Sequence, residues 1–368
     1  MNSKVILLGT SHPHIFHRIK YLQDRHMTIL GYFDSDENVS REMQKHVNCT
    51  RFTDPVELLS LDFDAVFIHG EDVQNPSYIQ SAIASGAKGI FVEKPGAAHP
   101  EQFNKLIPQI EAHGVIFEVG WELHYLEIVE FARNVLRTSL LGHITEARFH
   151  GGCPGGAGAE AWQSNIHNIG GFFYSLGGHV VETATDLFGL PTQVVASIRK
   201  LPKEKPHSGY SWVPGLFEQK ELNPMKAIGT LEYEDIASAI LEYKTKNVHL
   251  DFTAWEPSGY LDDWTMDIYG VQGALHLNFD TPGGYLLLKD AKGEWKKGRN
   301  DLFPETIHKK GEMLQAAFIK QMDSFFRRIQ SRDEGLTNCN EKAAFNVLHL
   351  FQKLYESAEK RSWITIEE

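Results

Sequence analysis

Cysteine, net positive charge and long hydrophobic runs are all scarce in this sequence. The three cysteines, Cys49, Cys153 and Cys339, are far apart and odd in number, so we expect reduced thiols rather than disulfides or a cysteine-based zinc site. The formal net charge of −12 argues against a nucleic-acid or anionic-membrane partner, because both need a basic surface. The apolar runs are too short for a signal peptide or a membrane span. We therefore expect a cytoplasmic protein.

The length and composition predict two globular domains. The chain has 368 residues, of which 42% are hydrophobic and 23% charged, an ordinary balance for proteins with sizeable cores. Domains usually run to roughly 100–200 residues. We place the first at residues 1–122 and the second at residues 123–368.

The first 120 residues or so alternate between short apolar runs and helical segments. The expected strands are Lys4–Leu8, Met27–Phe33, Ala65–His69, Ile90–Glu93 and Val115–Val119. The expected helices are Pro13–Leu22, Val39–His46, Pro55–Leu59, Pro76–Ser85 and Pro100–His113. Continuous apolar strands are typical of a sheet buried on both faces. The alternation predicts an α/β fold with a Rossmann-type, doubly wound parallel sheet.

The pattern changes after about residue 123. Strands of period two are expected at Thr145–His150, Gln193–Arg199, Ala237–Lys244, Asn247–Thr253, Trp264–Gly270 and Ala274–Phe279, after a helix at Leu126–Leu136. Strands that follow one another without helices between them indicate a large, mostly antiparallel sheet. Helices at Glu312–Ile329 and Glu341–Glu359 would cover one face of it. The second domain is thus expected to be α+β.

The turn after the first strand stands where a G-x-G-x-x-G loop would hold a pyrophosphate on a helix N-terminus. It reads Gly9-Thr10-Ser11-His12-Pro13-His14, so Ser11 and His14 replace the second and third glycines. Two interpretations stay open: a plain strand–helix turn, or a dinucleotide loop that includes Thr10 and His12.

Asp34 ends the second strand and stands where a carboxylate would bind the ribose hydroxyls of a dinucleotide. A carboxylate there repels a 2′-phosphate, so NAD is favoured over NADP. The alternative is that Asp34 caps the turn into Ser35 and Asp36.

Lys94 lies in the run Phe91-Val92-Glu93-Lys94-Pro95, at the end of a predicted parallel strand. Open α/β sheets bind ligands at this edge, so we expect Lys94 to act as a hydrogen-bond donor or acid rather than as a surface charge. Glu93 and His69, which end two of the strands, are expected beside it at the cofactor.

A third segment, Gly170–Glu182, carries a diglycine and then Ser175 and His179, which are four residues apart. On one helix these two side chains share a face, with Glu182 on or near it. A histidine on an apolar helix is most often a core residue, but the small neighbours of His179 favour approach of a ligand.

These segments, in this order, resemble the Gfo/Idh/MocA family of sugar and inositol oxidoreductases. Glu93-Lys94-Pro95 looks like the family's hallmark, and Gly170–Glu182 resembles its G-G-x-x-x-D-x-G-x-H-x-x-D helix. Leu141-Gly142-His143-Ile144 and Gly270-Val271-Gln272-Gly273 are similar to two of its sheet turns. His17 falls where many members carry a histidine. The similarity covers nearly the whole chain.

The resemblance implies an NAD-dependent enzyme that transfers a hydride between the nicotinamide ring and a hydroxyl-bearing carbon of a sugar, polyol or sugar derivative. His179 would be the general base, and Lys94 would orient the hydroxyl. The implied substrate contacts are Lys94, His124, Trp162, Asn165, His167, Ser175 and His179. For the segment that holds Trp162, Asn165 and His167, an ordered loop packed on the sheet is the alternative.

The sequence departs from the family pattern at four positions. Ser175 replaces an aspartate, His124 replaces an arginine, and Ser11 and His14 replace glycines. These departures leave a second hypothesis open, a non-catalytic regulatory protein that binds a dinucleotide or a sugar. A third hypothesis is loss of cofactor binding, with the side chain of His14 filling the space of the pyrophosphate.

Two expectations concern other partners. The resemblance implies a homodimer or homotetramer built on the open face of the second sheet. No metal site is expected: His12, His14 and His17 are close in sequence, but no carboxylate or thiolate near them completes a ligand set.

Overall fold

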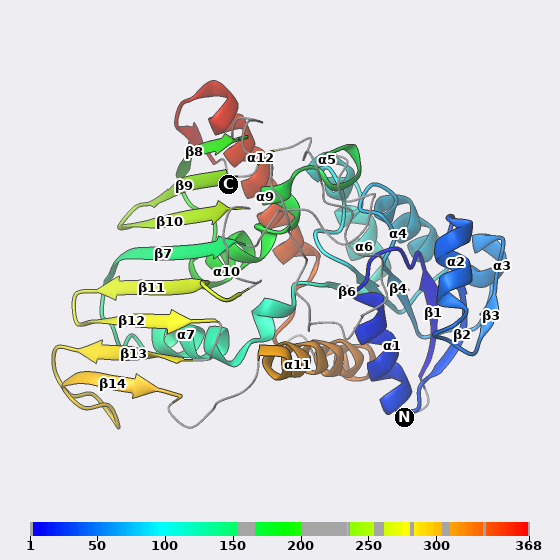
Figure 1. Cartoon of the computed structure of the whole chain (residues 1–368), viewed down its shortest axis with the longest axis horizontal. Helices are drawn as coiled ribbons and strands as arrows, with labels where there is room; N and C mark the ends of the chain where they lie inside the picture. The colour runs from blue at the N-terminus through cyan, green and yellow to red at the C-terminus, as the bar shows by residue number, and fades with distance from the viewer. Residues whose placement is uncertain are drawn as a thin grey trace. The chain divides into compact units, whose positions relative to one another are not determined.

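The computed structural model describes residues 3–152, 166–200, 234, 236–253, 261–279, 283–303, 310–333 and 336–366. The chain divides into two compact units (Figure 1). The first unit holds Met1–Glu122, Glu160–Gly170 and Gln315–Leu348, and the second holds Leu123–Ala159, Gly171–Leu314 and His349–Glu368.

The first unit contains a six-stranded parallel sheet of order β3-β2-β1-β4-β5-β6. Its strands are β1 (Lys4–Leu8), β2 (Thr28–Phe33), β3 (Thr50–Arg51), β4 (Ala65–Ile68), β5 (Gly89–Val92) and β6 (Ile116–Val119). The expected Rossmann-type sheet is confirmed. Strand β3 was not expected, because two polar residues give no periodic signal.

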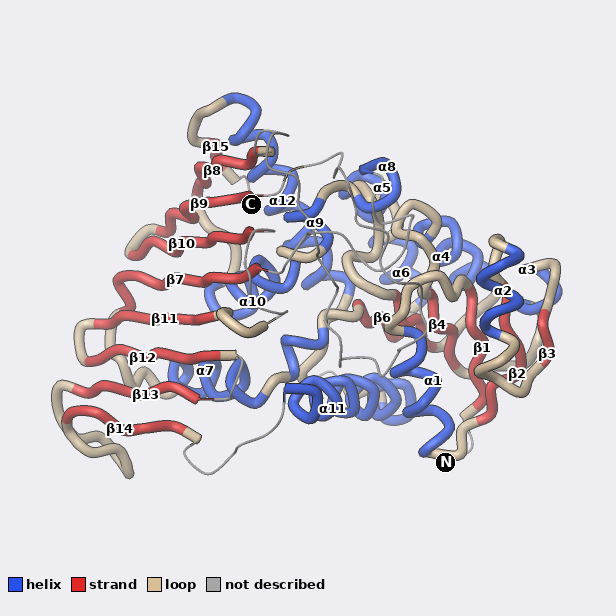
Figure 2. The backbone as a smooth tube through the Cα atoms, viewed as in Figure 1, coloured by secondary structure: helices blue, strands red, loops and turns tan. Residues whose placement is uncertain are grey.

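Helices alternate with these strands (Figure 2). They are α1 (Ile15–Asp24), α2 (Glu37–Met43), α3 (Pro55–Leu59), α4 (Asn75–Ala84), α5 (Pro100–Asn104) and α6 (Ile107–His113). The single helix expected at residues 100–113 is wrong. It divides after Asn104, because Pro108 has no amide hydrogen to bond the carbonyl four residues back.

A long C-terminal helix, α11 (Lys310–Ser331), packs against the first sheet. Its Met322, Phe325 and Phe326 share one apolar core with side chains of β1, β4 and β5, among them Phe67 and Phe91. This corrects the expectation that the segment 312–329 covers the second sheet. The helical pattern predicted the helix. An apolar face, however, does not specify the sheet against which the helix packs.

The second unit contains a nine-stranded sheet of order β14-β13-β12-β11-β7-β10-β9-β8-β15. Its strands are β7 (Ile144–Gly152), β8 (Gln193–Arg199), β9 (Ile236–Tyr243), β10 (Lys246–Thr253), β11 (Thr265–Gly270), β12 (Gly273–Asn278), β13 (Gly283–Leu288), β14 (Gly298–Leu302) and β15 (Ile364–Thr365). Within this second sheet, only β7 and β10 pair in parallel among the described strands. The mostly antiparallel sheet is therefore confirmed. Strands β13, β14 and β15 were not foreseen.

Helices cover this second sheet. They are α7 (Glu127–Arg137), α9 (Phe172–Ser175), α10 (Gly178–Phe188) and α12 (Glu341–Lys360), and a 3-10 turn, η1, spans Glu122–Tyr125. Helix α10 lies on β7 and β10 and beside α7 (Figure 1). Phe351 of α12 packs edge-on against Phe173, and Ser357 accepts a hydrogen bond from the backbone amide of Ala196 at 3.0 Å. None of the described helices combines the length and apolar composition that a membrane span requires.

A buried ion pair joins α11 to β6 in the first unit. Arg328 donates to the carboxylate of Glu118 and to the carbonyl of Phe117. The same carboxylate accepts from Gln321 at 2.9 Å and from the amide of Cys339 at 3.3 Å. Both charged side chains are buried.

We expect Arg328→Met to lower the free energy of unfolding by about 3–5 kcal/mol, because it leaves the Glu118 carboxylate buried without its cation. The double variant Glu118→Gln/Arg328→Met should recover part of that loss. Denaturant unfolding followed by circular dichroism measures both. Lys20→Met, which removes an exposed pair with Asp24, is the control and should change stability by less than about 1 kcal/mol. Equal effects of the two single variants would contradict the buried pair's role.

Candidate functional site

The structure brings the predicted cofactor residues of the first unit to one edge of its sheet. The loop Gly9–His14 follows β1, Asp34 follows β2, His69 follows β4, and Glu93 and Lys94 follow β5. The carboxyl ends of parallel strands meet at this edge, where open α/β sheets bind ligands. Apart from Gly9, all of these side chains are buried, Lys94 to 3% exposure.

Asp34 holds the first loop in place. Its Oδ2 accepts hydrogen bonds from the backbone amide of Thr10 at 2.6 Å, from the Thr10 hydroxyl at 3.0 Å and from the Ser11 hydroxyl at 3.2 Å. Its Oδ1 accepts from the amide of Asp36 at 2.9 Å. Asp36, in turn, caps α2. Asp34 thus supports the turn after β2 and also lies where a ribose diol would be recognised.

Three further amides of the loop are used within the protein. The amide of Gly9 donates to the carbonyl of Phe33, and that of His12 donates to the carbonyl of His69, each at 2.8 Å. The amide of His14 donates to Nδ1 of His12 at 3.2 Å, and Pro13 has none. Asp34 keeps the position at the end of β2 where a ribose-binding carboxylate stands in such units. A pyrophosphate would find fewer outward amides here than in a G-x-G-x-x-G loop.

Gly9 is required by the fold itself. Its φ is +77°, and a Cβ at this position would lie 2.7 Å from the backbone nitrogen of Gly70. The first glycine of the motif is therefore kept because β1 and the residues after β4 approach too closely for a side chain.

Three histidines surround the carboxylate of Glu93. Nδ1 of His14 lies 3.0 Å from Oε1 and Nδ1 of His12 lies 3.9 Å from it, while Nε2 of His69 lies 3.6 Å from Oε2. Burial lowers the pKa of His14 to about 3 and also lowers those of His12 and His69. Burial raises the pKa of Glu93 to about 7, against the opposing charges of Lys94 and Arg18. The imidazoles are therefore neutral near pH 7.

Two further carboxylates at this edge were missed from the sequence. Glu122 and Asp72 are buried, and burial raises the pKa of each. Each follows the carboxyl end of a strand, β6 or β4, and this position was the signal that could have identified them.

In the second unit, the helix expected to carry Ser175 and His179 is interrupted. Ser175 is the last residue of α9, and His179 is the second residue of α10. Gly177 lies at the break, where a Cβ would sit 2.4 Å from the ring of Phe173. The expectation of one continuous helix face is thus wrong. Both side chains are nevertheless buried, His179 to 1% exposure.

His124 pairs with Glu182, which the sequence placed on or near the same helix face as His179. Its Nδ1 lies 2.8 Å from Oε1 of Glu182, and both side chains are buried. Arg133 of α7 donates to Asp186 at 2.5 Å and to the carbonyl of His124. Where the family pattern has an arginine, this unit therefore has an imidazole–carboxylate pair.

The other predicted substrate residues are placed as follows. Trp162 and Asn165 lie outside the described residues. His167 is exposed on α8 (Ile166–Ile169), in the first unit.

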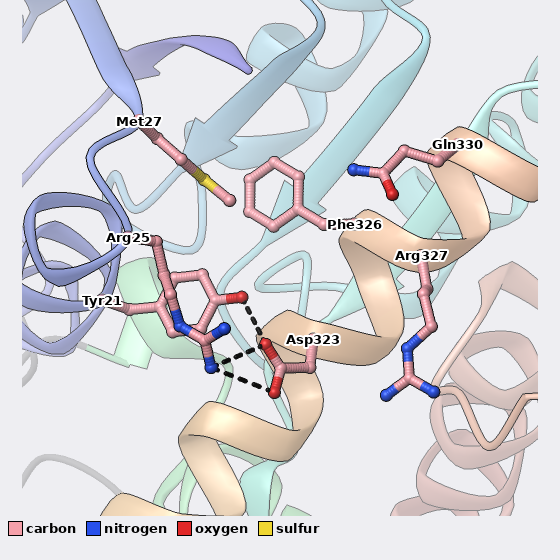
Figure 3. Close-up of a pocket in the computed structure, with 7 residues that line it drawn as sticks. All are labelled: Tyr21, Arg25, Met27, Asp323, Phe326, Arg327 and Gln330. Atoms are coloured by element: carbon pink, nitrogen blue, oxygen red, sulfur yellow. Dashed lines mark hydrogen bonds and ion pairs between the residues drawn. The ribbon is translucent and has the colours of Figure 1, made fainter. Parts of the chain in front are cut away.

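A surface cavity of about 330 Å³ lies at the opposite edge of the first sheet (Figure 3). Its lining residues are Tyr21, Arg25, Met27, Asp323, Phe326, Arg327 and Gln330. Asp323 already accepts a hydrogen bond from Tyr21 at 2.6 Å and pairs with Arg25 at 3.2 Å (Figure 3). Met27 precedes β2, so this cavity is at the amino ends of the strands, away from the predicted site.

Two family models match the chain. Residues 4–121 match the oxidoreductase family with the NAD-binding Rossmann fold, and residues 129–276 match the GFO/IDH/MocA C-terminal domain. The first match confirms NAD as the expected cofactor of this unit. No curated protein sequence matches the chain significantly.

Solved structures share the fold along the whole chain. A levoglucosan dehydrogenase in complex with NADH has a TM-score of 0.80 and 17% identity, with 100% of each chain covered. The WlbA dehydrogenase of Bordetella pertussis, in complex with NADH and UDP-GlcNAcA, has a TM-score of 0.78 and 14% identity, covering 100% of this chain and 98% of that one. An NAD-binding oxidoreductase of Klebsiella pneumoniae has a TM-score of 0.76 and 13% identity, with 100% of each covered.

We expect Gly9→Ala to destabilise the protein by about 2–4 kcal/mol. The left-handed φ costs about 1–2 kcal/mol with a Cβ, and the overlap with Gly70 adds overpacking strain. Gly114→Ala is the matched control, because Gly114 has a φ of +59° but nothing within 4 Å of a Cβ. Thermal and denaturant unfolding of both variants measure the difference. Equal losses would show that the approach of Gly70 contributes nothing.

Proposed function

The chain belongs to the Gfo/Idh/MocA oxidoreductase family, and from this premise we propose that it is an NAD-dependent dehydrogenase of a sugar, polyol or sugar derivative. The observation that carries the proposal is a buried lysine, Lys94, at the carboxyl end of β5 in an NAD-binding Rossmann unit. A lysine is expensive to bury. Its place at the ligand-binding edge of the sheet favours a chemical role over a structural one.

The first unit recognises the cofactor. Asp34 accepts hydrogen bonds from the hydroxyls of the adenosine ribose. Its negative charge repels the 2′-phosphate of NADP. When bound, the nicotinamide supplies or accepts the hydride. The chain's own residues position the substrate and move its proton.

Two residues act on the substrate in this proposal. His179 accepts the proton of the reacting hydroxyl as a general base. Lys94 donates a hydrogen bond to the same oxygen and stabilises the negative charge that develops on it. Ser175 contributes a neutral hydrogen bond, where an aspartate would contribute charge. His124 and Glu182 form the buried pair that completes the substrate side of the second unit.

A second candidate function is supported by the first loop. Four of its amides, those of Gly9, Thr10, His12 and His14, bond within the protein. The ring of His14 packs beside Phe318, with ring centroids 5.5 Å apart. A loop closed in this way favours a regulatory protein that binds a dinucleotide or a sugar without turnover.

The cellular location and the oligomeric state in this proposal follow from the sequence. We place the protein in the cytoplasm as a homodimer or homotetramer assembled on the open face of its second sheet.

We expect a screen of sugars and polyols with NAD to identify a substrate by the absorbance of reduced nicotinamide. Lys94→Ala and His179→Ala should each lower kcat by about 100-fold or more, as expected for a proton-transfer or charge-stabilising group. Lys105→Ala and His113→Ala, which change exposed residues of the first unit, are the controls. Full activity in either site variant would refute the assigned role. Tight binding without any absorbance change would favour the regulatory function.

We also expect Asp34→Asn to narrow the preference for NAD over NADP. The amide keeps an acceptor for Thr10 and Ser11 but removes the charge that repels a 2′-phosphate. The ratio of the two Kd values should fall at least about tenfold, which corresponds to about 1.4 kcal/mol. Calorimetric titration of both cofactors measures this ratio. An unchanged ratio of Kd values would show that Asp34 does not select the cofactor. No heat from wild-type protein with either cofactor would overturn dinucleotide binding itself.

A further inference from the structure

The cluster around Glu93 has the composition of a metal site. His12, His14 and Glu93 each offer a ligand atom, and these atoms lie within 4.8 Å of one another. His69 lies beside this set, with Nε2 3.6 Å from Oε2 of Glu93. All four side chains are buried, His69 and Glu93 completely.

The topology of the sheet brings these groups together. His12 and His14 follow β1, His69 follows β4, and Glu93 follows β5. Strands β1, β4 and β5 are neighbours in the sheet, so their carboxyl ends converge. The sequence did not reveal the set, because Glu93 is 79 residues from His14.

Some of the polar atoms in the cluster lack hydrogen bonds. Oε2 of Glu93 has no hydrogen-bond partner among the described residues, and the same holds for both ring nitrogens of His69. A buried polar atom without a partner is unfavourable. The carboxylate of Glu93 therefore gains if an ion binds it.

The spacing suits a small divalent ion. Bonds of about 2.1 Å in tetrahedral geometry place ligand atoms about 3.4 Å apart, and Nδ1 of His14 and Nδ1 of His12 lie 3.0 and 3.9 Å from Oε1 of Glu93. We propose that His12, His14 and Glu93 bind one divalent transition-metal ion of the zinc type. Imidazole and carboxylate ligands are the set that such ions accept.

Other charged side chains lie near the cluster. Lys94 and Arg18 add positive charge near the cluster, while Glu122 and Asp72 add carboxylates. His12 Nδ1 accepts a hydrogen bond from the amide of His14, which the ion replaces if it binds that atom.

The bound ion ties the loop after β1 to the end of β5. This inference does not depend on the proposed function, because it concerns the first unit without cofactor or substrate.

The test uses full-length protein freed of any histidine tag and stripped with a chelator. Co²⁺ is titrated first, followed by its visible absorption bands, and Zn²⁺ is then titrated in competition with a chromogenic chelator. We expect one ion per chain and a rise in Tm on addition of Zn²⁺. His14→Ala and Glu93→Gln should each weaken binding by at least about 10- to 100-fold, because ligand loss costs no less than loss of an outer-shell partner.

His113→Ala is the control, because it removes an exposed histidine of the same unit and should leave binding unchanged. Circular dichroism establishes that each variant is folded. His12→Ala serves as a further variant if either of the first two fails to fold. Absence of binding to the wild-type protein, or undiminished binding in the folded ligand variants, would overturn the proposal.

Discussion

The constraint on which the candidate site depends is the burial of a carboxylate, Glu93, at the end of a strand covered on both faces. A buried carboxylate is stable only if other groups satisfy it or if it takes up a proton. Here three imidazoles and a lysine gather around it, and burial raises its pKa to about 7. The loop after β1 therefore folds inward toward Glu93, so the conformation of this loop follows from the end of β5 as much as from its own sequence.

A second buried charge has a comparable effect on the frame of the first unit. Glu118 on β6 pairs with Arg328 and also accepts hydrogen bonds from Gln321 and Cys339. These partners come from a segment more than 200 residues away along the chain. The ion pair and the aromatic core of α11 together make the C-terminal helix part of the Rossmann unit. The first unit is thus defined by which residues pack together, and a single domain boundary in the sequence does not describe it.

The sequence sufficed where the signal is local. Periodicity predicted the parallel sheet, most of the antiparallel strands and both long helices, and the strand ends located Asp34, Glu93 and Lys94. Two features were out of reach because they depend on distant partners. They are the sheet against which α11 packs and the pairing of His124 with Glu182. The break at Gly177 is local, and a side chain there would overlap the ring of Phe173.

The two proposals for the first unit are linked through one loop. The cofactor requires the amides and the space at the start of α1, whereas the ion requires the side chains of His12 and His14 turned toward Glu93. If a dinucleotide displaces His14 from Glu93, each ligand weakens binding of the other by the same factor, because coupling free energies are reciprocal. The residue that departs most from the glycine motif, His14, would then make cofactor binding dependent on metal, a role that a glycine at the same position could not perform.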